Sequence, residues 1–89
     1  MRVAVERFLD DFDERVRFHT VATLFSQEDR TSVTALMRAL ISEESVRIKN
    51  RIAEGMLARE WVCPAELSND IMNALPTGYA LREGIVRKN

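Results

Sequence analysis

Hydrophobic residues recur at helical spacing through most of this chain, and within its first third their phase changes. The first stripe comprises Val5, Phe8, Leu9, Phe12 and Val16, and the second comprises Phe18, Val21, Ala22 and Phe25. At 100° per residue the centres of the two stripes lie roughly 150° apart around a helix. A straight helix would be apolar on two nearly opposite sides. We therefore predict a helical region over residues 3–25 that either kinks near Arg17 or contacts two separate surfaces.

Two opposite apolar stripes need two covering surfaces. We interpret one stripe as facing the chain's own core. The other, formed by Phe18, Val21, Ala22 and Phe25, we interpret as the surface that binds a partner chain. A short chain gains limited stability from its core, and Cys63 is the only cysteine, so oligomerisation is the remaining source of stability. We expect a homodimer. The alternative is that the first region is kinked and both stripes are buried within one chain.

Three further helices follow. Residues 32–41 carry apolar side chains at every position expected for one buried stripe, and helices are also predicted over residues 44–61 and 65–75. Gly55, inside the third predicted helix, is either a tolerated interior glycine or a point of close helix approach. Pro64 separates the last two helices, and residues 79–89 could form a helix, a strand or a loose arm. No internal repeat stands out.

The composition fits one small globular domain. The 89 residues are 46% hydrophobic, and the net charge of −1 gives no overall attraction to nucleic acid or membranes. No targeting segment or membrane-spanning run is visible, and the single thiol favours a reducing compartment, so we expect a cytoplasmic protein. The fold class predicted is all-α: a compact bundle of about four helices, residues 1–89, with a short C-terminal appendage.

The sequence contains no recognisable active site. His19 and Cys63 are the only histidine and cysteine, so we expect no metal site, no cofactor and no nucleophile–base pair at work. The acidic cluster Asp10, Asp11, Asp13 and Glu14 is typical of a solvated helix face. We therefore predict that the protein is not an enzyme.

The alternative function is DNA binding. Residues 32–61 have the rough dimensions of a helix-turn-helix, and the second of its helices offers Arg47, Lys49, Asn50 and Arg51 as contacts to phosphates and bases. The glutamates at 43 and 44 would face phosphates there, which weakens this hypothesis. The preferred prediction is a small regulatory or adaptor protein that acts by protein–protein binding, to itself, to another protein, or to both.

Overall fold

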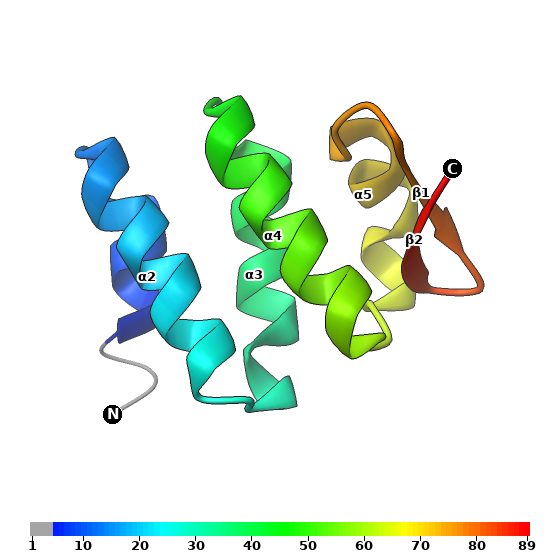
Figure 1. Ribbon diagram of the computed structural model, residues 1–89, viewed down its shortest axis with the longest axis horizontal. Coiled ribbons are helices and arrows are strands. Elements are labelled where there is room, and N and C mark those ends of the chain that lie inside the picture. Colours follow the sequence, from blue (N-terminus) through cyan, green and yellow to red (C-terminus); the bar gives the residue numbers. More distant parts are fainter. Residues whose placement is uncertain (1–4) are drawn as a thin grey trace.

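The computed structural model describes residues 5–89 and confirms the predicted fold class: a helical bundle with a short C-terminal appendage (Figure 1). Residues 5 and 6 are helical and continue into the 3-10 helix η1; together they form the N-terminal helical segment, residues 5–10. The predicted start at residue 3 lies outside the described residues. The elements in chain order are η1 (Arg7–Asp10), α2 (Glu14–Ser26), η2 (Arg30–Ser32), α3 (Val33–Ser42), α4 (Val46–Arg59), η3 (Ala65–Leu67), α5 (Ser68–Ala74), β1 (Tyr79–Arg82) and β2 (Ile85–Lys88).

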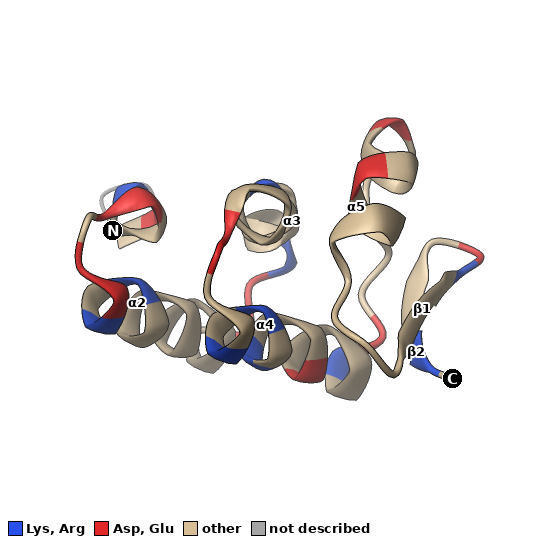
Figure 2. Cartoon of the chain, turned by 90° about the horizontal axis from the view of Figure 1, so that it is seen from above, with Lys and Arg blue, Asp and Glu red and all other residues tan. Residues whose placement is uncertain are grey.

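The helices form two layers. Helices α2 and α4 lie side by side in one layer, and the N-terminal helical segment, α3 and α5 lie in the other (Figure 2). Helices α2 and α4 run in the same direction, and α3 runs opposite to both (Figure 1). The chain therefore builds two consecutive helix pairs, the N-terminal segment with α2 and then α3 with α4. Helix α5 and the β-hairpin follow at the far end.

The break in the first helical region falls at residues 11–13 and not near Arg17, which corrects the predicted position. The Asp11 carboxylate accepts the backbone N–H of Asp13 at 2.8 Å, and Asp13 caps α2 by accepting the N–H of Arg15. The Arg17 guanidinium then donates to the carbonyl oxygens of Asp11 and Phe12, at 2.9 and 3.2 Å. Short acidic side chains that bond to nearby backbone compete with the helical hydrogen bonds. At residues 11–13 these side-chain bonds interrupt the helix.

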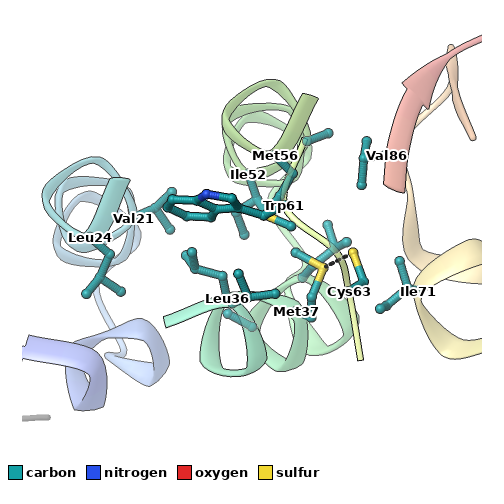
Figure 3. Close-up of a cluster of buried hydrophobic side chains, with 14 of the residues drawn as sticks. Val21, Leu24, Leu36, Met37, Ile52, Met56, Trp61, Cys63, Ile71 and Val86 are labelled. Carbon is teal, nitrogen blue, oxygen red and sulfur yellow. Dashed lines mark hydrogen bonds between the residues drawn. The ribbon is translucent and has the colours of Figure 1, made fainter. Parts of the chain in front are cut away.

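The core fills the space between the two layers. Figure 3 shows side chains from α2, α3, α4, α5 and β2 converging, with the Trp61 ring lying among them. Phe25 stacks on Trp61 with ring centroids 6.1 Å apart. The residues of this core that are fully buried are Leu24, Phe25, Leu36, Met37, Leu40, Ile52, Ala53, Met56, Ile71 and Val86.

The C-terminal tail, for which the sequence allows a helix, a strand or a loose arm, is an antiparallel hairpin. Strands β1 and β2 pair Leu81 with Val86, and the two-residue turn between them has positive φ at both Glu83 (55°) and Gly84 (80°). Turns of this kind match the natural twist of a hairpin. The backbone N–H of Cys63 donates to the carbonyl of Gly84 at 2.8 Å, which ties the hairpin to the segment after α4.

The two helix pairs repeat one another at an offset of 32 residues, a relationship that the sequence analysis missed. Asp13 caps α2 and Ser45 caps α4, and both caps bond to the first turn of their helix. Arg15 and Arg47 then occupy equivalent positions, as do buried Leu24 and Met56. Few residues are identical between the two pairs, so the repeat becomes visible only when the caps align it.

Candidate functional site

The second apolar stripe, predicted as a partner surface, lies largely inside the folded chain. Val21 is 1% exposed and Phe25 is 0% exposed, while Phe18 and Ala22 are half-buried. Phe18 lies beneath the guanidinium of Arg47, whose central carbon is 3.9 Å from the ring centroid. Helix α4 packs on this stripe, so Val21 and Phe25 are not available to form the predicted dimer interface in the folded protomer, and Phe18 and Ala22 are only partly accessible.

The first stripe is the one that reaches the surface. Leu9 is buried, but Phe8 is 40% exposed and Phe12 is fully exposed. The first helical region has two apolar faces, as predicted, but the face that contains Val21 and Phe25 is the more buried one and the face that contains Phe8 and Phe12 is the more exposed one. The reversal arises because the break at residues 11–13 separates the first stripe into two segments, and α4 packs on the opposite side of α2.

An open groove of about 610 Å³ lies between the N-terminal helical segment and the outer face of α2. This face of α2 points away from α4, because its residues lie opposite Phe18 and Phe25 on the helix. Most of the exposed area inside the groove is apolar. The residues that line it are Val5, Phe8, Asp13, Arg15, Val16, His19, Thr20 and Thr23.

Polar groups stand at the edge of this groove. Arg15 donates to Asp13 at 3.1 Å, and this hydrogen bond lowers the pKa of the Asp13 carboxyl. The side chain of Arg15 is 84% exposed, so its guanidinium remains accessible to a ligand. His19 is exposed on the same face. The groove thus combines apolar side chains with the carboxylate of Asp13, the guanidinium of Arg15 and the imidazole of His19. Such a surface suits a partner that is itself part apolar and part polar.

The junction between the two helix pairs contains one largely buried ion pair and one more exposed ion pair. Glu43 is 8% exposed and binds the Arg17 guanidinium through both carboxylate oxygens, each at 3.0 Å. Glu14 accepts from Ser45 Oγ at 2.7 Å and from Arg47. Figure 2 shows acidic positions in the chain segments that lead into α2 and α4. These contacts join the second helix pair to α2 of the first.

The four residues named as possible nucleic-acid contacts lie on α4, and three of them already make contacts within the chain. Arg47 pairs with Glu14 and stacks on Phe18, and Arg51 lies over Phe25 with its central carbon 5.3 Å from the ring centroid. The Asn50 amide donates to the carbonyl of Val46 within the helix, and Lys49 is half-buried. Helices α3 and α4 form an antiparallel hairpin, which differs from the crossed helices of a helix-turn-helix (Figure 1).

His19 and Cys63 lie in different parts of the fold. His19 is on the outer face of α2, whereas Cys63 is buried beside Met37, with the two sulfur atoms 3.6 Å apart (Figure 3). Burial raises the pKa of the Cys63 thiol to about 11, so the thiol is protonated at neutral pH. Within residues 5–89, no cluster of three metal-ligating side chains is present, and no helix has the length and hydropathy needed to cross a bilayer.

Sequence reasoning missed the groove because it missed the turn. Phe8 and Val16 were read as one continuous stripe, but they stand on two walls that face each other. The available signal was the pair of aspartates before Glu14, since aspartate followed by a charged first turn is a common helix start.

Comparison with models of known protein families found no match for this chain. Comparisons with curated proteins and with solved structures likewise gave no match.

Proposed function

We propose that this protein is a small, non-enzymatic regulatory or adaptor protein that binds another protein through the groove of its first helix pair. The observation that carries the proposal is the open apolar groove lined by Phe8 and Val16, in a first helix pair that also exposes Phe12 fully. Exposed apolar surface of this kind, rimmed by polar groups, is characteristic of interaction sites.

The chemistry of the groove favours a protein partner. Its floor offers aliphatic and aromatic carbon, with hydroxyls from Thr20 and Thr23 and ionic groups only at the rim. Protein interfaces have this composition, with an apolar centre enclosed by a polar edge. A second copy of the chain is one such partner, and in this proposal it uses the same groove, because Phe25 of the other stripe is buried against α4.

The experiment compares three immobilised proteins: wild type, Val16→Lys and Thr34→Lys. Val16 lines the groove, whereas Thr34 is exposed on α3. Lysine at position 16 places a charge in the groove while its stem keeps some apolar contact, so the fold should survive. With extract from the native host, we expect one or more proteins to be retained by wild type and Thr34→Lys and lost from Val16→Lys. Identical sets of retained proteins on all three would refute the proposal.

The second candidate is DNA binding through α4, and it is favoured by one observation. Three arginines lie on one side of α4 at helical spacing, Arg47 over Phe18 of α2 and Arg51 and Arg59 over Phe25 of α2. Binding to duplex DNA through these residues would weaken steeply as salt rises, and Arg51→Ala would reduce it. Absence of binding at low salt would eliminate this candidate.

A further inference from the structure

The groove on the first helix pair has an equivalent surface on the second helix pair, and α2 covers that second surface. Adding 32 to each residue that lines the groove gives its equivalent in the second helix pair. At the rim, Asp13, Arg15, His19 and Thr23 correspond to Ser45, Arg47, Arg51 and Gly55.

All four of these equivalents contact α2. Ser45 donates to Glu14, Arg47 lies over Phe18, and Arg51 lies over Phe25. Gly55 is so close to the Phe25 ring that an added Cβ would come within 2.4 Å of it. In the second helix pair, this surface is therefore the one on which a helix rests.

The remaining four lining residues give the same result. These four are Val5, Phe8, Val16 and Thr20. Their equivalents in the second helix pair are almost completely shielded from solvent, whereas Phe8 in the groove is 40% exposed. These buried equivalents are Met37 (0% exposed), Leu40 (0%), Ile48 (1%) and Ile52 (0%). The first helix pair thus presents the face that the second pair uses to bind a helix, but none of residues 5–89 covers it.

From this repetition we propose that the occupant of the groove is an amphipathic α-helix of a partner protein, laid along α2 as α2 is laid along α4. This inference rests on the proposed function and names the kind of partner. Phe18 and Phe25 stand seven residues apart on α2, so the partner helix carries two large apolar side chains at that spacing. In stacked helical repeats each unit buries its apolar face against its neighbour, and a unit left at the end offers that face to another helix.

Two departures from the repeat define the ligand further. Asp13 stands where Ser45 does, so an acidic residue matching Glu14 would meet a carboxylate, and a neutral or basic residue fits better. Thr23 stands where Gly55 does, so the second apolar side chain sits farther from the groove floor than Phe25 does from α4.

The test uses the full chain and a synthetic helical peptide. The peptide copies residues 14–27 with glutamine at its first position in place of Glu14, and its termini are acetylated and amidated. A fluorescein label reports binding by anisotropy. The matched control peptide carries serine in place of both Phe18 and Phe25. We expect saturable binding of the first peptide by wild type, and binding at least tenfold weaker for the control peptide.

The protein variants locate the binding site. Thr23→Arg fills the groove, whereas Thr34→Arg alters exposed α3, and we expect at least a tenfold loss of affinity for the first and no change for the second. Equal affinity for Thr23→Arg and wild type, or no binding at the solubility limit of the peptide, would overturn the proposal. Self-association of wild type that Val16→Lys abolishes would also overturn it, in favour of a second copy. If host proteins still depend on Val16 while the peptide does not bind, the proposed function stands and only the helical partner is wrong.

Discussion

The ring of Phe25 on α2 lies directly against Gly55 on α4. A Cβ at Gly55 would lie 2.4 Å from two ring carbons of Phe25, and that ring is fully buried. Of the two interpretations of this glycine, close helix approach is the one that the structure supports. The guanidinium groups of Arg51 and Arg59 also lie over the Phe25 ring, with their central carbons 5.3 and 4.8 Å from its centroid.

The first prediction concerns this contact. Gly55→Ala should destabilise the protein by about 1–2 kcal/mol, because overpacking costs about 1–3 kcal/mol and exceeds the gain of up to about 1 kcal/mol in helix propensity. Denaturant unfolding followed by circular dichroism measures the change. Glu54→Ala, at an exposed position in the same turn, serves as control and should shift stability by less than about 0.5 kcal/mol. A Gly55→Ala protein more stable than wild type would show that the contact is looser than described.

The second prediction compares two phenylalanines of opposite stripes. Phe25→Ala removes a fully buried ring and should cost about 3–5 kcal/mol, a large part of the stability of so short a chain. Phe12→Ala removes a ring that is fully exposed and should leave stability within about 0.5 kcal/mol of wild type. Thermal unfolding measures both. A comparable loss for the two variants would mean that the assignment of inner and outer stripes is wrong.

The third prediction concerns the ion pair between the helix pairs. Arg17 and Glu43 have side chains that are 19% and 3% exposed, so Arg17→Ala leaves a buried carboxylate without its partner and should cost about 3 kcal/mol. Arg15 and Asp13 form an exposed pair with side chains 84% and 40% exposed, and Arg15→Ala should cost less than about 1 kcal/mol. Chemical denaturation distinguishes the two. Similar small losses would show that Glu43 is hydrated after Arg17 is removed.

These contrasts show what the sequence could and could not predict. Helical periodicity predicted α3 well, because Leu36 and Leu40 stand on one unbroken stripe. The first region was harder, because a run without glycine or proline still ended at Asp11, through side-chain bonds that periodicity does not register. The choice between core and surface stripe could not be made at all. It depends on which side of α2 packs against α4, and this is determined by tertiary structure and not by local periodicity.

The fourth prediction concerns acid pH. Hydrogen bonds from Arg47 and Ser45 lower the pKa of Glu14 below its ordinary value of 4.5. A carboxyl whose pKa is lowered on folding contributes stability above its unfolded pKa and loses it as pH falls through the folded pKa. Stability should therefore decline from about pH 4.5 downward, and the decline should be shallower in Glu14→Gln. Urea midpoints measured across this range, with exposed Glu54→Gln as control, test it. Parallel curves for wild type and Glu14→Gln would contradict the role of Glu14.

The central claim is that the outer face of α2 binds a helix in the same manner as the corresponding face of α4. The most direct measurement is an NMR titration of the isotope-labelled full chain with the residue 14–27 peptide that carries glutamine at its first position. We predict that the largest amide shift changes occur at Val16, His19, Thr20 and Thr23, while the amides of α5 and the hairpin remain unchanged. Shift changes concentrated on α4, or no changes at saturating peptide, would contradict the claim.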